Sequence, residues 1–401
     1  MTGIGPKGYL SLVFLLAGCA GVFGTSHPDP HAAASGDLDA QQVYQVYVGA
    51  ESADSLHRLR FDGRTIQVER STSVSHLYRT RKAADRFTDH ESPHGIGALD
   101  GGRYLYMTTG HGIPDGKLWK VEVGPDSAVA EPVDLGRFPA SLGISPDGDF
   151  VYVANFNLHG EMAPSSISVV YAPEMVEVAR TETCTMPHGS RVTPDGTRHH
   201  SVCMMDDQVV EIDTRTFQVV RRFSVAAGAD RPLDPEDRGH HAHSHGYHGY
   251  EASCSPTWVD HDPEGSMLYV ACNRSDEVLE IDVEGWELVR RFDTGRGPYN
   301  LEVTPDGRLL VVTLKQGDAV EFIRLEDGES VGRTDTSTTV VHGVVTSPDS
   351  RYAFVSVEGV GAEPGKVDVY DLRSFERVAS AEVGLQASGI TFWKMEDNES
   401  P

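Results

Sequence analysis

Short runs of β-branched and aromatic residues, separated by polar turns, recur along most of the chain. Residues 299–336 show the pattern clearly: the runs YNLEVT, RLLVVTLK, AVEFIRL and ESVGRTDT are separated by PDG, QGD and EDG. Asp-Gly turns between β-branched runs are the strongest short-range signal for a β-hairpin. No stretch keeps a helical period of apolar residues. The pattern therefore predicts an all-β protein built from four-stranded meanders.

The same four-strand unit recurs along the sequence. Its first strand begins at Pro93, Pro139, Pro187, Pro256, Pro298, Val341 and Ala387. Units of about 40 to 50 residues with four strands each are typical of β-propeller blades. The last unit contains only a first strand, ASGITFWKM, whereas residues 43–71 supply a second, third and fourth strand without a first. We therefore expect a seven-bladed β-propeller in residues 41–395 whose last blade is shared between the two ends of the chain.

Two segments resemble a known repeat. FVYVANFN (150–157) and LYVACNRSDEVLEIDVEGWELVRRFDTGRGPYNLEVTPDG (268–307) are similar to the YVTN-type (YncE-like) β-propeller repeat, and the resemblance extends over nearly all of residues 41–395. The resemblance implies the fold. Proteins with this repeat include surface-layer components, exported binding proteins and a few enzymes, so it leaves the function open.

The N-terminal residues resemble an export signal. The run YLSLVFLLAGCA is apolar, too short for a stable membrane span, and ends in small residues. Residues 16–19, LAGC, resemble the bacterial lipobox, which implies a signal peptide over 1–18 and lipidation of Cys19; an ordinary secretion signal is the alternative. Residues 19–40 then form a flexible tether and 396–401 a tail. We expect a lipid-anchored envelope protein, periplasmic or on the outer membrane.

The chain is strongly acidic. Its 34 Lys and Arg residues face 60 Asp and Glu residues, a net charge of -26. Such a surface repels phosphate backbones, which excludes nucleic acid as a partner. The expected partners are the membrane, through the lipid anchor, and another envelope protein, with the chain itself a monomer.

Four cysteines lie beyond the signal. Cys184 and Cys203 are 19 residues apart, and Cys254 and Cys272 are 18 apart. In each pair one cysteine precedes a first strand and the other ends a second strand, which places both at the same rim. In an exported chain this predicts the disulfides Cys184–Cys203 and Cys254–Cys272, with thiolate ligation of a metal as the alternative.

The residue after each first-strand start is expected to face the mouth of the central tunnel. Around the ring this position holds His94, Ala140, His188, Thr257, Tyr299, His342 and Ser388. The three imidazoles could converge on one copper or zinc ion or on a polar ligand; the alternative is a structural role as caps of the inner strands. Glycine follows each histidine, which lets neighbouring backbones approach closely.

Charged and polar side chains are expected deeper in the tunnel and at its rim. Arg191, Asp260 and Glu302 predict a salt-bridged belt or, with Tyr299 and Trp258, a ligand pocket. Further candidates at the ends of second strands are His111, Asn155, His159, Met204 and Lys315. His199 and His200 should point to opposite faces of their strand, so they cannot bind one ion together.

A histidine-rich insertion, residues 226–253, lengthens the third repeat and is expected to be a loop. It contains His240, His241, His243, His245 and His248. This composition binds zinc, copper or nickel loosely, and the loop lies at the same rim as the tunnel-mouth histidines.

Three functions fit the sequence. The first is a lipid-anchored binding or scaffold protein of the cell envelope that handles copper or zinc through the tunnel-mouth histidines and the histidine-rich loop. The second is a propeller enzyme, a lactone hydrolase or a copper-dependent oxidase, although no G-x-S-x-G nucleophile motif is present. The third is a metal-free platform for protein interactions.

Overall fold

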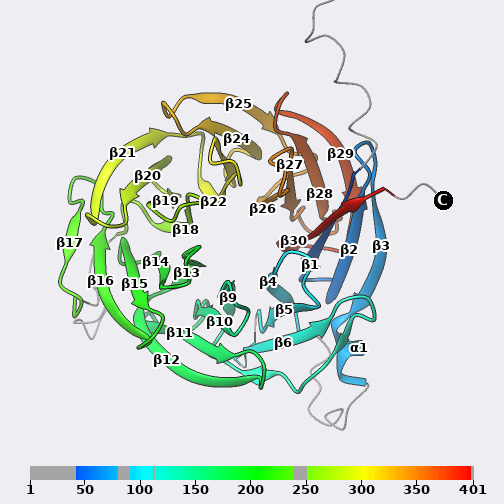
Figure 1. Cartoon of the computed structure of the whole chain (residues 1–401), viewed down its shortest axis with the longest axis horizontal. Helices are drawn as coiled ribbons and strands as arrows, with labels where there is room; N and C mark the ends of the chain where they lie inside the picture. Colours follow the sequence, from blue (N-terminus) through cyan, green and yellow to red (C-terminus); the bar gives the residue numbers. More distant parts are fainter. Residues whose placement is uncertain (1–41, 80–90, 112, 115, 238–250, 399–401) are drawn as a thin grey trace, which may run out of the picture. The chain divides into compact units, whose positions relative to one another are not determined.

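The computed structural model describes residues 42–79, 91–111, 113–114, 116–237 and 251–398. Within these residues the strands form seven antiparallel sheets, arranged as blades around one axis (Figure 1). This confirms the predicted all-β, seven-bladed propeller. Among the described residues, no helix has the length and apolarity needed to cross a membrane.

Each of the first six blades is a meander that starts at the axis and runs outward. The inner strands are β4 (Pro93–Ala98), β9 (Pro139–Ile144), β13 (Pro187–Val192), β18 (Pro256–His261), β22 (Pro298–Val303) and β26 (Val341–Thr346). The second strands are β5 (Tyr104–Thr109), β10 (Phe150–Asn155), β14 (Arg198–Cys203), β19 (Met267–Cys272), β23 (Leu309–Leu314) and β27 (Tyr352–Val357). The inner strands begin at the residues that the repeat predicted.

The outer halves of these blades follow the same order. The third strands are β6 (Lys117–Glu122), β11 (Pro164–Tyr171), β15 (Gln208–Asp213), β20 (Glu277–Asp282), β24 (Ala319–Arg324) and β28 (Lys366–Asp371). The outer strands are β7 (Ser127–Ala128) with β8 (Val133–Asp134), β12 (Val176–Thr185), β16 (Gln218–Ser224), β21 (Glu287–Asp293), β25 (Ser330–Asp335) and β29 (Glu376–Glu382).

The seventh blade combines the two ends of the described chain. Its inner strand is β30 (Ala387–Asp397), followed outward by β1 (Gln42–Ala50), β2 (Ser55–Phe61) and β3 (Ile66–Ser73). Figure 1 shows the blue β1 beside the red β30, and Val48 pairs with Ile390 across them. The shared blade is therefore confirmed, and it leaves neither strand as a free edge.

Two elements were not expected from the sequence. A short helix, α1 (Val74–Arg79), follows β3. In the insertion, β17 (Arg231–Leu233) pairs with β16, so part of residues 226–253 extends the third blade instead of forming a loop. The histidines from His240 to His248 lie outside the described residues, as do Cys19, the predicted signal peptide and the tether.

Apolar cores fill the spaces between neighbouring blades. Val311 and Val320 of the fifth blade, for example, pack with Val355 and Tyr370 of the sixth, and all four are fully buried. The pleat turns alternate side chains of the middle strands toward opposite neighbouring blades. Each blade is thus held by the two beside it, and burial of this apolar surface stabilises the ring.

Both predicted disulfides are present. Cys184, in the outer strand β12 of the second blade, is bonded to Cys203 at the end of β14 in the third. Cys254 lies before β18 and is bonded to Cys272 at the end of β19. The first bond joins two blades covalently, and these pairings overturn the alternative of thiolate metal ligation.

Candidate functional site

The start of each inner strand departs from regular sheet pairing. In the first blade the register between β4 and β5 shifts between Pro93 and Ile96, and comparable shifts occur in the other blades. The residue before each start has a positive φ: Ser92, Phe138, Met186, Ser255, Gly297, Val340 and Gln386. A bulge of this kind re-aims a side chain. Because of this bulge, the second residue of each inner strand, at the tunnel mouth, has no partner in the regular strand pairing.

Aspartates of the preceding blades hold this backbone in place. Asp276, between β19 and β20, accepts a hydrogen bond from the Gly297 amide at 2.7 Å. Asp318, between β23 and β24, accepts one from the Val340 amide at 2.6 Å. A left-handed conformation costs conformational energy at Val340 but not at a glycine, so the Asp318 bond offsets strain, whereas the Asp276 bond only fixes the backbone.

Glycines beside the histidines allow the inner strands to approach. A Cβ on Gly189 would lie 2.5 Å from Trp258 Cα, and one on Gly343 would lie 3.2 Å from the Ser388 carbonyl. The close approach expected from the histidine-glycine pairs is therefore found.

The three predicted tunnel-mouth histidines converge. The rings of His94 and His342 lie 5.2 Å apart, centre to centre, at nearly a right angle. The Tyr299 hydroxyl lies 3.2 Å from His188 Nε2 and 3.5 Å from His342 Nε2. All three histidines are buried. The side chains thus form one polar cluster at the axis.

His188 and His342 are neutral. His188 Nδ1 donates to the Thr257 carbonyl at 2.7 Å, so Nε2 carries the lone pair and accepts from Tyr299. Burial lowers the pKa of His188 to about 3 and places that of His342 well below its ordinary value. Both imidazoles are therefore available as acceptors or ligands.

Glu51 joins His94 and His111 into a second group. Its Oε1 lies 2.5 Å from His94 Nδ1, and its Oε2 contacts His111 Nδ1. One donor atom from each residue lies within 4.8 Å of the others. Burial would raise the pKa of Glu51, but the two imidazoles outweigh it and hold the pKa at about 2. The hydrogen bond to Glu51 raises the pKa of His111.

A lysine, Lys315, and a second glutamate, Glu358, lie close to Tyr299. Lys315 Nζ lies 4.1 Å from the centre of the Tyr299 ring and 2.7 Å from Glu358 Oε1. Burial would lower the pKa of Lys315, but Tyr299 and Glu358 together raise it. Burial raises the pKa of Tyr299. Tyr299 therefore stands as a neutral phenol beside a cation.

Aromatic rings close the remaining side of the site. Phe138 stacks on His111 with ring centres 4.4 Å apart, and Phe156 meets His188 edge-on at 4.7 Å. Met204 packs against this pair. The site thus combines an apolar wall with polar groups, as small-molecule sites usually do.

The charged belt predicted deeper in the tunnel is also present. Arg191 Nε lies 3.5 Å from Asp260 Oδ1, and Arg191 Nη2 lies 3.9 Å from Glu302 Oε2. Burial raises the pKa of both carboxyls, that of Glu302 to about 7. The guanidinium lies over the Trp258 ring at 5.0 Å.

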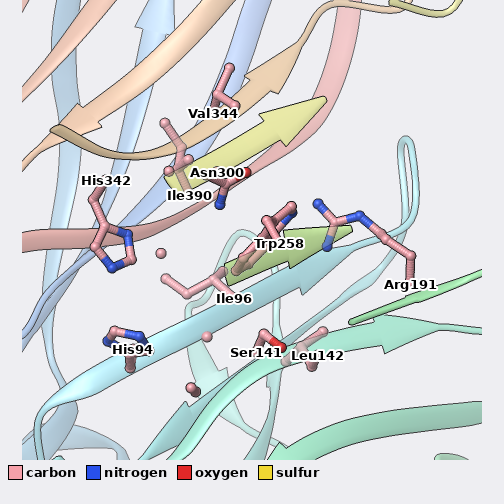
Figure 2. Close-up of a pocket in the computed structure, with 14 residues that line it drawn as sticks. His94, Ile96, Ser141, Leu142, Arg191, Trp258, Asn300, His342, Val344 and Ile390 are labelled. Carbon is pink, nitrogen blue, oxygen red and sulfur yellow. The ribbon is translucent and has the colours of Figure 1, made fainter. Parts of the chain in front are cut away.

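A cavity of about 40 Å³ is lined by Arg191 and Trp258 and by two of the histidines, His94 and His342. Figure 2 shows His94 and His342 at one end, Arg191 at the other, and Trp258 between them. Within the described part of the chain, Trp258 Nε1 and Asn300 Oδ1 find no hydrogen-bond partner. Both residues line the cavity, so two buried polar atoms without a partner among the described residues lie next to it.

Comparison with known proteins shows the fold alone. No protein-family model matches this chain, and no curated protein matches it. Among solved structures, the periplasmic gluconolactonase PpgL of Pseudomonas aeruginosa has a TM-score of 0.63 at 18% identity, covering 88% of this chain and 99% of that one. Hydrazine synthase of Kuenenia stuttgartiensis has a TM-score of 0.54 at 20% identity, covering 71% and 78%.

The sequence analysis did not predict Glu51 and Glu358 as site residues. Each directly follows a second strand, β1 and β27 respectively, the position that Lys315 holds after β23. A signal was therefore present, because this rim position aligns across the repeat in the same way as the tunnel-mouth position. The rim position of Glu51 was harder to recognise in the repeat because its blade is split between the two ends of the chain.

The remaining candidates take structural positions. Asn155 bonds the Gly136 amide and Ser168, and the His159 ring lies 6.4 Å from that of His111. His199 stacks on Tyr152 of the second blade, whereas His200 bonds His261 of the fourth. The opposite orientations predicted for the two adjacent histidines are confirmed.

Proposed function

We propose that this chain is an extracytoplasmic β-propeller that binds a transition-metal ion, zinc or copper, through Glu51, His94 and His111. The observation that carries the proposal is the convergence of their three donor atoms within 4.8 Å at the axis. Two imidazoles and one carboxylate suit divalent first-row metals and leave coordination positions open. The binding role expected from the tunnel-mouth histidines is therefore kept, with a different set of primary ligands.

The burial of Glu51 supports this assignment. Its side chain is only 2% exposed, and an ionised carboxylate in such a place needs a cationic or hydrogen-bonding partner. His94 and His111 provide that partner from two neighbouring segments. An ion bound by the same three residues would balance the buried charge directly.

The surrounding groups favour a ligand-binding or catalytic role over a closed structural metal site. His342 and Phe138 lie next to the His94 ring, and Tyr299 lies next to His342. They would contact any molecule that reached the open positions of the ion. His188 and His342 belong to this outer group in the proposal and serve as acceptors.

Two disulfides support an oxidising compartment outside the cytoplasm. Lipidation of Cys19, the membrane attachment and an envelope protein partner are kept as part of the proposal on the sequence signals alone. The histidine-rich loop would then supply additional, weaker metal ligands at the cell envelope.

Lactone hydrolysis is the second candidate function. The Tyr299 hydroxyl donates to the neutral His188 Nε2, which places a proton donor and an acceptor beside the proposed metal ligands. A solved structure of similar fold is named a gluconolactonase. In this role the neutral Tyr299 hydroxyl would donate a hydrogen bond to the carbonyl oxygen of the lactone and so orient it, while His188 would position that hydroxyl.

Elemental analysis tests the metal site. The full chain is purified without a histidine affinity tag, in a background where the five loop histidines from His240 to His248 are serine. We expect about one zinc or copper ion per chain, lost in Glu51→Gln and His111→Ala and kept in the control His159→Ala. Retention of metal by a Glu51→Gln/His111→Ala double variant, or no binding in the loop-substituted background, would overturn the proposal.

Turnover separates the two functions. Gluconolactone hydrolysis is followed with and without a chelator, in the native sequence and in Tyr299→Phe. Metal binding without turnover identifies a binding protein, whereas chelator-sensitive turnover that falls at least tenfold in Tyr299→Phe identifies a hydrolase.

A further inference from the structure

The tunnel has a second chamber on the far side of Trp258 from the histidines. The third residue of each inner strand is small in five blades, but Trp258 and Asn300 occupy this position in the fourth and fifth. Beyond the indole, where the inner strands turn, lies a cavity of about 430 Å³. This volume lies within the usual range of small-molecule sites, roughly 300 to 1,000 Å³.

The chamber is apolar on one side and charged on the other. Its apolar wall comes from the sixth, seventh, first and second blades: Val345, Ile390, Phe392, Ile96, Leu142 and Ile144. Arg191 and Glu302, from the third and fifth blades, form the charged wall, and the exposed Asp100 of the first blade also lines the chamber. A ligand that fills the chamber therefore needs an apolar body and one polar end.

The charged wall sets one guanidinium against two carboxyl groups, so its net charge is negative when both carboxyls are ionised. Glu302 Oε1 accepts hydrogen bonds from the Thr346 amide at 2.7 Å and from its hydroxyl at 3.0 Å, which fixes the carboxylate. Its other oxygen, Oε2, lies 3.9 Å from Arg191. Asp260, 3.5 Å from Arg191, takes a share of the same guanidinium. One cation thus faces two carboxylates, and Glu302 Oε2 has the weaker contact.

We propose that this chamber binds an organic cation, a primary amine with a compact apolar body, whose ammonium group pairs with Glu302. The apolar body would lie against Ile96, Leu142 and Ile390. An anionic ligand is disfavoured because Arg191 is already shared between two carboxylates, and the whole chain carries a charge of -26. The inference is independent of the metal site, since neither Glu51 nor His111 lines this chamber.

Calorimetric titration with three ligands of equal length tests the charge preference. Hexylamine, hexanoate and hexanol are titrated into the full chain at pH 8, above the pKa of about 7 of Glu302. We expect hexylamine to bind at least tenfold more tightly than either of the other two. Equal binding of hexanol, tighter binding of hexanoate, or no binding of hexylamine overturns the proposal.

Variants locate the site. Glu302→Gln should weaken hexylamine binding at least tenfold, whereas Glu287→Gln, an exposed change on β21, should leave it unchanged. Glu302→Asp keeps the negative charge but moves it away from the ligand by one methylene group, so we expect an intermediate loss of hexylamine affinity. This second variant keeps the test decisive if Glu302→Gln fails to fold. Unchanged binding in both Glu302 variants, each checked for a native melting transition, would refute the assignment.

Discussion

The Tyr299 hydroxyl lies 3.2 Å from His188 Nε2, although the two residues are 111 positions apart and a complete blade separates them in the sequence. Both occupy the second position of an inner strand, in the fifth and third blades. The contact is made across the tunnel mouth. It shows that residues at one repeat position, which the sequence spreads around a ring, meet at the axis.

Loss of this contact should lower stability. In Tyr299→Phe the buried His188 Nε2 would have no donor from Tyr299, and a buried polar atom without its partner costs about 1–3 kcal/mol. Tyr171→Phe, a half-buried control on β11, should change the free energy of unfolding by less. Urea denaturation measures both, and equal stability of Tyr299→Phe and the native sequence would show that this bond contributes nothing.

The shared blade should be indispensable. Deletion of residues 387–397 would remove β30, leave β1 as an open edge and uncover the apolar surfaces of Val46 and Val48. We expect aggregation or loss of the cooperative melting transition, measured by circular dichroism. A control chain that lacks only residues 398–401 should melt like the native protein. A soluble, cooperatively melting product of the first deletion would contradict the closure.

Each disulfide should stabilise the propeller measurably. The bonds close loops with sequence separations of 19 and 18 residues, for which loop-closure entropy gives about 3 kcal/mol. Cys184→Ser/Cys203→Ser and Cys254→Ser/Cys272→Ser should each lower the unfolding free energy by this order. If neither double variant shifts the denaturation midpoint, the structure must hold these segments without the covalent bonds.

Glu302 should make stability decrease with pH in the ligand-free protein. Burial, followed by Asp260, raises its pKa from the ordinary 4.5 to about 7 despite the opposing Arg191. Between these pH values Glu302 keeps its proton in the folded chain but has released it in the unfolded chain. The stability that the protonated Glu302 contributes is therefore complete below about pH 4.5 and is lost as the pH rises through 7.

Glu302→Gln removes this dependence because the amide stays neutral. The variant should match the native protein near pH 4.5 and exceed it above pH 7 by about 3 kcal/mol. Thermal melts at both pH values measure the difference. A melting-temperature difference that is the same at pH 4.5 and pH 8 would contradict the raised pKa.

The turn signals and the repeat were sufficient for the fold because hairpins are local. The inner strands begin at Pro93, Pro139 and the other aligned residues, and the second position does reach the tunnel mouth. Aligning the repeats could not predict the bulge or the left-handed residue before it, because residues as different as Ser92, Phe138 and Val340 adopt that conformation. There the surrounding hydrogen bonds outweigh residue preference.

The repeat sufficed to predict the number of blades, their strand order, the two disulfides and the ring position of His94, His188 and His342. It did not show that Glu51 and His111 share a site with His94, which depends on the folded ring. Glu51 follows the first described strand, and it meets His94 and His111 because β30 pairs with β1 and closes the ring. A contact between segments that belong to different blades depends on closure of the whole circle, and no local pattern of residues encodes it.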